Sequence, residues 1–424
     1  MANNFASNVT EKLLRKFLEG WDSDLVTLKT IDRQVISDSD WDPTSGETIK
    51  VKRPHDYFTR RTDEGDISSG TNNSIQSGSA VATVQQYFTV KTDWTQKDEA
   101  LFFDQPEKIL FPVRKRIATD IETDFNAYML KHGAHLVGTA GTAVSAWDDV
   151  AAVDAYTRAF GFPADHVYAQ LGPHSIKALA SAQNGILNAN LSGSSWEKAS
   201  INMDFGGVMA YRSSSLVPHT VGAWDAGTTL NATPTATYVA VKDTFQMTLS
   251  IAGFDASTTG ILKAGDMLQI TDNSRYWLNQ QTKNTMHDGT NPVKWTCVVT
   301  ADVDSSAGGV ATPVVEGPAI FESSGQQNSV SSAITSGDAI TVISGTAGST
   351  NYPNMFYHKQ AFGIQFVKLP PLQGWDSTVI SIEDFSIRCT KYSDADTNQQ
   401  KIRFDVLPAY VTYNPMLAGR FFGA

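Results

Sequence analysis

The stretch from Gln105 to Gly133 constrains the fold most, because it predicts one long, two-faced helix in a chain otherwise rich in β-like runs. Its apolar side chains recur every three or four residues, which is the period of an amphipathic helix. Asp104 and Glu107 resemble a capping box, and Gly133 is a natural C-terminal stop. From Pro112 to His132 the helix would be about 31 Å long. The apolar positions are Leu110, Val113, Ile117, Ile121, Phe125 and Tyr128.

Pro112 leaves two forms of this helix open. A proline inside a helix removes a hydrogen bond and clashes with the preceding turn, whereas a proline in the first turn is well tolerated. Either the helix bends at Pro112, or the main helix starts there.

The charges on this helix run against its dipole. Basic side chains precede acidic ones, and the reverse order would stabilise a helix. Two interpretations stay open: a solvated face that tolerates roughly a few tenths of a kcal/mol, or a basic cluster that faces acidic groups on another subunit. The basic residues are Arg114, Lys115 and Arg116, and the acidic ones are Asp120, Glu122 and Asp124.

Composition narrows the class of protein. The 424 residues suffice for two or three domains, and a hydrophobic content of 41% allows a sizeable core. We find no run of 18 apolar residues and no signal-peptide pattern at the start, so we predict no membrane span. Two distant cysteines predict a reducing compartment without a disulfide framework. A net charge of −11 argues against a protein that binds nucleic acid over a broad basic surface. It does not argue against a protein that surrounds nucleic acid without binding it tightly.

Near the N-terminus, apolar residues recur every four positions and predict a short helix, which either packs on its own core or docks on a partner. These residues are Val9, Leu13, Phe17, Trp21 and Leu25.

Two β-like runs, Glu47–Arg53 and Ala80–Trp94, enclose a mostly polar stretch of 26 residues. A long loop in a compact domain is usually functional or disordered, and a lone hairpin is marginal in water. We therefore predict that an intersubunit contact holds this loop. Both signs of charge crowd into its middle, at Arg60, Arg61, Asp63, Glu64 and Asp66.

Two segments after the long helix differ in their predicted secondary structure. The stretch from Trp147 to Trp196 predicts a helix, a buried strand and a second helix. From Ala223 to about Gly345 short β runs recur between turns, which is typical of an all-β barrel or sandwich. This window holds 11 acidic and 5 basic residues. The runs are ATYVAVK, FQMTLSIAGF, DMLQITD, VKWTCVVTADV, TPVVEGPAIF and DAITVISG.

We find little sequence support for catalysis or metal binding. His132 and His135 are predicted to be solvated residues at a helix end, because no further ligands lie nearby in the sequence. Cys297 and Cys389 lie in β runs without a neighbouring histidine. Two acidic clusters depart from the EF-hand pattern, so we predict turns there and expect no cofactor. These clusters are Asp38, Asp40 and Asp42, and Asp394, Asp396 and Asn398.

The order of several segments over nearly the whole chain resembles the major capsid proteins of tailed phages with the Hong Kong 97 fold. More narrowly, it resembles the coat proteins of short-tailed Lederbergvirus-type phages. The likeness rests on SNVTEKLLRKFLEGWDSDLVTLKTIDRQ, IKVKRPH, PVRKRIATDIETDFNAYMLKHGA, ILKAGDMLQI and DFSIRCTKYSDADTNQQKIRFDVLPAYVTYNPMLAGRFFGA.

The resemblance implies an α+β capsid fold with an inserted domain. Residues 1–46 would be the N-terminal arm, 47–95 the extended loop, and 96–134 the spine helix of the peripheral domain. Residues 135–222 would form the first part of the axial and peripheral core, and 347–424 its C-terminal part. Residues 223–346 would be an inserted all-β barrel domain.

The resemblance also implies partners. Copies of the chain would form the hexamers and pentamers of an icosahedral virion capsid, assembled in the bacterial host cytoplasm with a scaffolding protein and a portal protein. The shell would enclose double-stranded DNA without sequence-specific binding. Acidic candidates for scaffold docking are Glu11, Glu19, Asp22 and Asp24. Candidates for contact between subunits are Arg60, Arg61, Asp63, Glu64, Asp66, Arg114, Lys115 and Arg116.

Two other classes of function are weighed against a capsid protein. One is a virion surface or receptor-binding module whose β-rich part contacts glycans. The other is a hydrolase, which would need Cys297 or Cys389 for activity.

Overall fold

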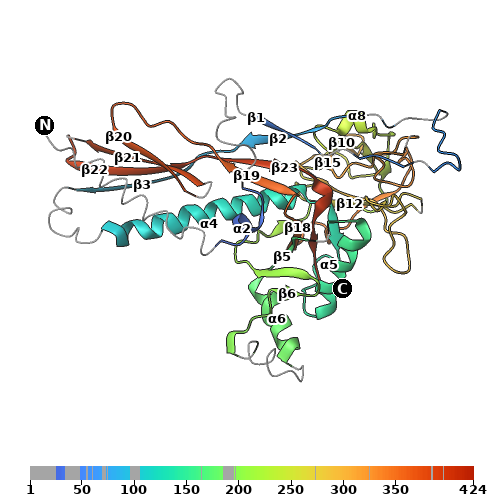
Figure 1. The fold of residues 1–424 in the computed structure, drawn as a ribbon, viewed down its shortest axis with the longest axis horizontal. Helices are drawn as coiled ribbons and strands as arrows, with labels where there is room; N and C mark the ends of the chain where they lie inside the picture. The colour runs from blue at the N-terminus through green and yellow to red at the C-terminus, as the bar shows by residue number, and fades with distance from the viewer. Residues whose placement is uncertain are drawn as a thin grey trace. The chain divides into compact units, whose positions relative to one another are not determined.

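A computed structural model describes residues 25–33, 48–53, 56–59, 61–68, 73, 75–95, 106–163, 165–184, 195, 197–272, 274–323, 325–382, 385–394 and 396–424. Figure 1 labels the helices and strands in chain order. The chain divides into two compact units. The first unit comprises residues 1–49, 82–126 and 362–411, and the second comprises 50–81, 127–361 and 412–424.

The predicted long helix is confirmed as α4, Pro106–His132. Pro112 lies inside it, so the alternative in which the main helix starts at Pro112 is wrong. In the first unit, α4 buries Ile117, Ile121 and Phe125, three of the six apolar positions that the periodicity singled out. The ring of Phe125 lies edge-on to Tyr410 at 5.0 Å and to Phe362 at 6.4 Å. The helix therefore packs on strands β23, Pro408–Thr412, and β19, Phe362–Phe366.

The first unit also contains an antiparallel sheet with the strand order β20-β21-β22-β3. Its strands are β20 Asp376–Ile382, β21 Phe385–Asp394, β22 Gln399–Val406 and β3 Phe88–Thr95. The segment FSIRCTKY lies within β21, and KIRFDVLPAYVTY divides between β22 and β23. The run Ala80–Trp94 also divides: β3 pairs with β22, whereas Thr83 and Val84 of β2, Ser79–Val84, pair with β23. Strand β1, Thr48–Lys52, and the short helix α2, Thr27–Thr30, precede these elements.

A six-stranded sheet in the order β4-β24-β18-β5-β7-β6 lies in the second unit. The helix, buried strand and helix predicted between Trp147 and Trp196 are confirmed as α5 Trp147–Phe160, β5 Val167–Leu171 and α6 Pro173–Asn184. The other strands are β4 His135–Val137, β24 Ala418–Phe421, β18 Asn354–His358, β7 Val208–Arg212 and β6 Asp204–Phe205. A 3-10 turn, Pro415–Leu417, precedes β24.

The window from residue 223 to 346 is rich in short strands, as its sequence predicts. Five form a sheet in the order β10-β15-β13-β12-β16, and three form a sheet in the order β14-β11-β9. The strands are β9 Thr229–Leu230, β10 Gln246–Thr248, β11 Ile251–Ala252, β12 Met267–Ile270, β13 Thr296–Val299, β14 Val310–Ala311, β15 Val314–Glu316 and β16 Ile340–Val342.

One β prediction in this window is wrong. The segment ATYVAVK contains a one-turn helix, α8 Tyr238–Val241, instead of a strand. The Tyr238 N–H donates a hydrogen bond to Glu322 Oε1 at 2.8 Å, so a distant carboxylate satisfies an N–H at the start of this turn.

The two ends of this window lie side by side. Strand β8, His219–Thr220, comes just before it, and β17, Thr350–Asn351, comes just after it. They pair antiparallel, with His219 opposite Asn351. The hydrophobic core of the window is continuous with that of α5, because the Trp277 ring lies 5.5 Å from that of Phe160.

Candidate assembly surfaces

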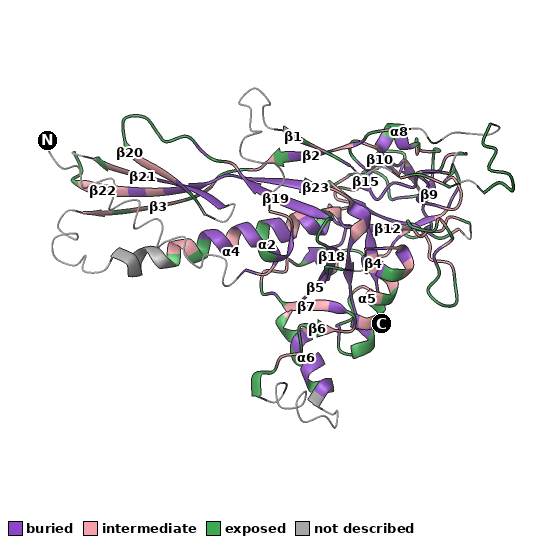
Figure 2. Cartoon of the chain, viewed as in Figure 1, coloured by how far each residue is buried: buried purple, intermediate pink, exposed green. Residues whose placement is uncertain are grey.

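The described residues of the polar loop between β1 and β2 are largely exposed (Figure 2). Arg61, Asp63, Glu64 and Asp66 are all exposed, and Arg60 lies outside the described residues. The Ser68 N–H donates to Asp66 Oδ1 at 2.9 Å, and this hydrogen bond lowers the pKa of Asp66. The Asp66 carboxylate is therefore charged at neutral pH, and all four side chains are accessible to a partner.

A pair of hydrogen bonds crosses this loop. The Phe58 N–H donates to Asn73 Oδ1 at 3.0 Å, and Asn73 Nδ2 donates to the Phe58 carbonyl at 2.9 Å. The Asn73 amide thus replaces a backbone partner and joins two chain segments 15 residues apart.

The basic cluster on α4 is largely exposed. Lys115 and Arg116 are exposed, and Arg114 is partly buried. Arg116 Nε lies 2.9 Å from Asp120 Oδ2, one turn along the same helix, with 73% of the arginine side chain exposed. Such an exposed pair contributes about 0.3–0.5 kcal/mol. Contact of this cluster with another subunit stays a prediction.

The acidic half of α4 is only partly a solvated face. Glu122 is buried, and its carboxylate accepts hydrogen bonds from the Val26 N–H at 3.1 Å and the Thr27 hydroxyl at 3.3 Å. Burial raises the pKa of Glu122, and those hydrogen bonds oppose the rise. Asp124 accepts a hydrogen bond from the Tyr410 hydroxyl at 2.9 Å. A solvated-face interpretation is therefore wrong for Glu122, which holds the start of α2 against α4.

The candidates for scaffold docking, Glu11, Glu19, Asp22 and Asp24, lie outside the described residues. The same holds for the first acidic cluster, Asp38, Asp40 and Asp42, and for the predicted N-terminal helix up to Trp21. In the second cluster Asp394 Oδ1 accepts the Asp396 N–H at 3.2 Å, where β21 turns into β22, so the predicted turn is confirmed.

The prediction that His132 and His135 are solvated is wrong. The helix stops at Gly133, and His135 enters β4 with its side chain fully buried. Its Nε2 lies 2.9 Å from the Met416 carbonyl, and its Nδ1 lies 3.0 Å from the Tyr156 hydroxyl. Burial lowers the pKa of His135 to about 4, so the ring is neutral at pH 7. His132 Nδ1 lies 2.8 Å from Oε1 of the buried Glu316.

Neither cysteine is an activated nucleophile. Cys297 and Cys389 are fully buried, and burial raises the pKa of both thiols, to about 12 for Cys389. A thiol acts as a nucleophile in its thiolate form, which these surroundings oppose. Across the described part of the chain we find no group of three or more His, Cys, Asp or Glu residues placed to hold a metal.

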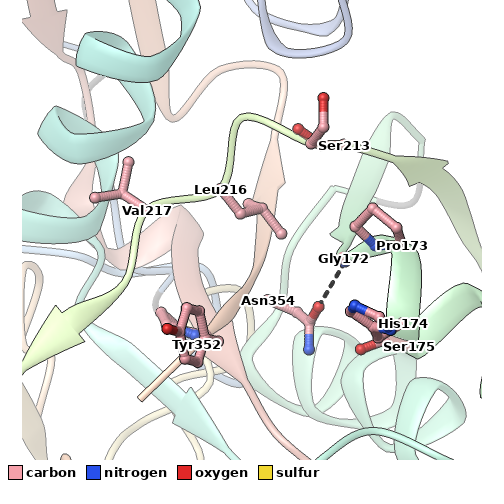
Figure 3. A pocket seen from close by; sticks show the side chains of 11 residues that line it. Gly172, Pro173, His174, Ser175, Ser213, Leu216, Val217, Tyr352 and Asn354 are labelled. Atoms are coloured by element: carbon pink, nitrogen blue, oxygen red, sulfur yellow. Dashed lines mark hydrogen bonds between the residues drawn. The ribbon is translucent and has the colours of Figure 1, made fainter. Parts of the chain in front are cut away.

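A small pocket at the start of α6 contains a histidine and serines (Figure 3). Of the residues drawn there, all of them described, only Gly172 and Asn354 are joined by a hydrogen bond, from the Gly172 N–H to Asn354 Oδ1 at 3.0 Å. His174 therefore has no serine in hydrogen-bond contact within this pocket, as a nucleophile and its base would require.

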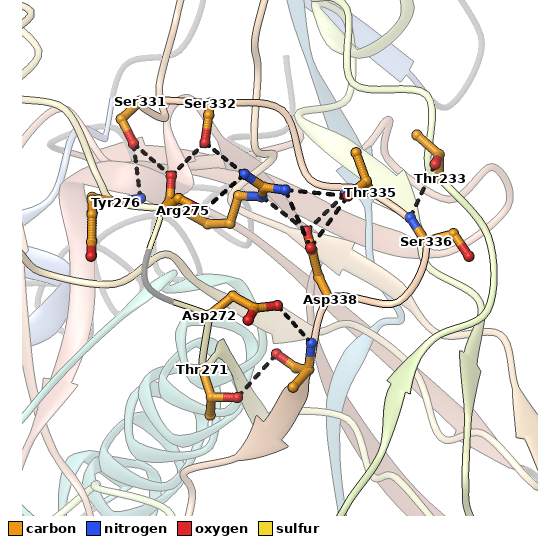
Figure 4. Close-up of polar contacts among 12 residues, drawn as sticks. Thr233, Thr271, Asp272, Arg275, Tyr276, Ser331, Ser332, Thr335, Ser336 and Asp338 are labelled. Carbon is orange, nitrogen blue, oxygen red and sulfur yellow. Dashed lines mark hydrogen bonds and ion pairs between the residues drawn. The ribbon is translucent and has the colours of Figure 1, made fainter.

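Sequence reasoning missed an ordered charge cluster around Arg275 (Figure 4). Arg275 Nε lies 2.9 Å from Asp338 Oδ2, and a second guanidinium nitrogen lies 3.2 Å from Oδ1, which is a bidentate pair. Asp338 also accepts the Thr335 N–H at 2.8 Å. The two charged residues are 63 positions apart, so no sequence pattern links them.

Among the described residues, no helix has the length and apolar character needed to cross a membrane.

Comparison with known proteins assigns the chain to a family. The P22 coat protein family (gene protein 5) matches residues 1–423. The major capsid protein of Acyrthosiphon pisum secondary endosymbiont phage 1 is 40% identical over 425 residues, which span 100% of both chains. A structure from Mycobacterium phage Che8 is 10% identical, with 94% of this chain and 92% of that chain covered and a TM-score of 0.46. The capsid structure of Cyanophage P-SCSP1u is 11% identical, with 93% and 86% covered and a TM-score of 0.42.

The match over the whole length defines the class of protein: it is a structural component of a phage capsid, and not an enzyme. The chain belongs to the P22 coat protein family and is a major capsid protein, located in the shell of the virion, which is assembled in the host.

Proposed function

We propose that this capsid protein forms an icosahedral shell of hexamers and pentamers around double-stranded DNA, together with a scaffolding protein and a portal protein. In this proposal the subunit has the Hong Kong 97 fold and is of the Lederbergvirus type. The family match over residues 1–423 carries the proposal. The packing of the long helix α4 on β19 and β23 supports it, because a thin shell subunit needs a stiff element across its width.

The parts of the subunit would follow the order expected from the sequence. Residues 1–46 would be the arm that meets the scaffold, 47–95 the extended loop, and 223–346 an inserted β domain. The pairing of β8 with β17 supports the insertion, because the chain leaves and returns at neighbouring strands. The core shared with α5 indicates that this part depends on the rest of its unit.

Contacts between subunits would involve the exposed charges of the loop and of α4. An exposed ion pair contributes about 0–1 kcal/mol, so a wrong contact is easily undone. Repetition around a closed shell then supplies overall stability through multivalency. The net charge of −11 fits a wall that encloses DNA without binding it tightly.

The test is co-expression with the candidate scaffolding protein, followed by sedimentation and electron microscopy. We expect closed particles of uniform size from the natural sequence. The double variant Arg60→Glu/Arg61→Glu should lower the particle yield at least tenfold while the unassembled subunit stays folded by circular dichroism. The control is Lys359→Glu, which changes an exposed cation outside the loop.

Normal shells from the double variant would refute the role of the loop charges. Only small soluble species from the natural sequence, with a scaffold shown to bind, would refute the shell itself. A soluble trimer with glycan affinity would instead indicate a surface-binding module.

A further inference from the structure

The two ends of the exposed loop between β1 and β2 are held by contacts within the same chain. We propose that Lys242, Asp243, Phe245 and Lys283 form a loop clamp, which fixes the direction of the loop on its own subunit before a neighbour is met. The clamp residues lie within residues 223–346, which we call the β-rich window. They would act as positioning residues for the loop. The value of this clamp in assembly rests on the proposed contact role of the loop.

At the N-terminal end of the loop, Arg53 is anchored through its side chain. Its guanidinium lies 3.7 Å from the centre of the Phe245 ring, and Nη1 donates to the Tyr413 carbonyl at 2.6 Å. Arg53 is only 6% exposed, so this cation–π contact is shielded from water. Phe245 has a φ of 53°, in the left-handed region that a bulky side chain rarely adopts. Backbone strain of this kind persists only where the surroundings fix it.

Three residues further on, Asp56 forms a second anchor. Lys283 Nζ lies 2.7 Å from Asp56 Oδ2. Gln326 Nε2 donates to the Asp56 carbonyl at 2.5 Å. Both the side chain and the backbone of Asp56 are therefore bound to the β-rich window, immediately before the exposed part of the loop.

The C-terminal end of the loop is bound next to α8. Asp243 Oδ1 accepts the N–H and the hydroxyl of Ser79, both at 3.0 Å. Lys242 Nζ donates to the Ser77 carbonyl at 3.1 Å and pairs with Asp243 Oδ2 at 3.0 Å. A Cβ on Gly78 would lie 2.5 Å from the Lys242 carbonyl, so the two backbones are in close contact.

The two anchored ends are also joined to each other, because the Arg53 N–H donates to the Gly78 carbonyl at 2.9 Å. Between them, Tyr57, Ile67 and Ile75 expose 53%, 62% and 76% of their surface. A loop with a fixed base loses less conformational entropy when its tip is bound than a free loop does. The clamp thus pre-organises an exposed, partly apolar loop for contact with a second copy of the chain.

The test compares Asp243→Ala and Lys283→Ala with the natural sequence in the unassembled full-length subunit. Trypsin cleavage after Arg61 and hydrogen exchange of amides 56–77 report the freedom of the loop. We expect at least fivefold faster cleavage and exchange in both variants, with the urea midpoint unchanged. The matched control is Asp302→Ala, which removes another exposed carboxylate that accepts a backbone N–H, at Ala264. Unchanged cleavage and exchange in folded Lys283→Ala and Asp243→Ala would overturn the clamp.

Assembly with the scaffold separates the clamp from the contact role. A freer loop with slower assembly supports both. A freer loop with unchanged assembly supports the clamp and counts against the contact role. If Asp243→Ala fails to fold, Lys283→Ala alone decides, because Lys283 touches the loop through one surface ion pair.

Discussion

Replacing Asp266 should destabilise the base of the β-rich window, because this fully buried carboxylate joins three donors. Its Oδ1 lies 2.8 Å from His219 Nε2. Its Oδ2 accepts the Gly222 N–H at 3.1 Å and the Lys263 N–H at 2.7 Å. The carboxylate thus connects β8 with the turn before β12, at the point where the chain enters the window.

The size of the effect follows from the donors left behind. An unsatisfied buried donor costs about 1–3 kcal/mol. The Lys263 N–H is only partly buried and can bind water instead, so we do not count its full cost with those of the other two donors. Two fully buried donors, on His219 and Gly222, lose their acceptor, so we expect Asp266→Ala to lower the free energy of unfolding by about 3–5 kcal/mol.

Asp266→Asn is the matched control, because it keeps the shape and one acceptor oxygen. That oxygen can still accept both backbone N–H groups, and the amide nitrogen then faces His219. Burial lowers the pKa of His219, so its ring is neutral at pH 7 and can present an acceptor nitrogen. We expect a smaller loss, about 1–2 kcal/mol.

The assay is urea unfolding of the unassembled subunit, followed by tryptophan fluorescence. Trp277 and Trp295 are fully buried in the window and report its unfolding. With a slope of about 3 kcal/mol per molar urea, Asp266→Ala should lower the midpoint by about 1–1.7 M. A loss below about 0.5 kcal/mol would refute the reasoning, since that is the ordinary range for surface substitutions.

Two further predictions concern buried ionisable groups. Burial lowers the pKa of His135 from 6.5 to about 4, so the unfolded chain binds more protons between these values. Stability should fall by up to about 3 kcal/mol as the pH drops from 6.5 to 4, and His135→Gln should flatten this dependence in urea titrations at several pH values. Asp405→Ala should cost about 3–5 kcal/mol, because it leaves the buried Arg388, now 2.8 Å from Asp405 Oδ2, without its counter-charge. Arg388→Met/Asp405→Leu should recover most of that loss in thermal unfolding, and an equal loss in the double variant would contradict the charge argument.

The long helix could be predicted because its information is local. The spacing of Ile117, Ile121 and Phe125 fixes the buried face, whatever lies opposite. The role of Glu122 could not be predicted, because its partners at Val26 and Thr27 are 95 or more residues away. Within a charged stretch of sequence, a glutamate that is buried in the fold cannot be distinguished from one that is solvated.

Two wrong predictions also concern features that the local sequence pattern does not carry. Tyr238–Val241 has β-forming residues, but a carboxylate from Glu322 binds its first N–H and favours a helical turn. The burial of His135 could not be predicted, because its strand, His135–Val137, has only three residues and is too short to show an alternating pattern. The loop clamp likewise joins distant segments, so the sequence predicts the exposed charges but not what holds their base.

The pairing of β8 with β17 has a consequence for how such a chain can change over time. Adjacent strands are about 4.8 Å apart, so a two-residue turn could bridge the gap that the window of residues 223–346 now fills. On the proposal that residues 223–346 are an insertion, their loss or exchange would leave the paired segments His219–Thr220 and Thr350–Asn351 in the chain. The core shared with Phe160 sets the cost of such an exchange, because any replacement must cover the apolar surface that Trp277 now covers.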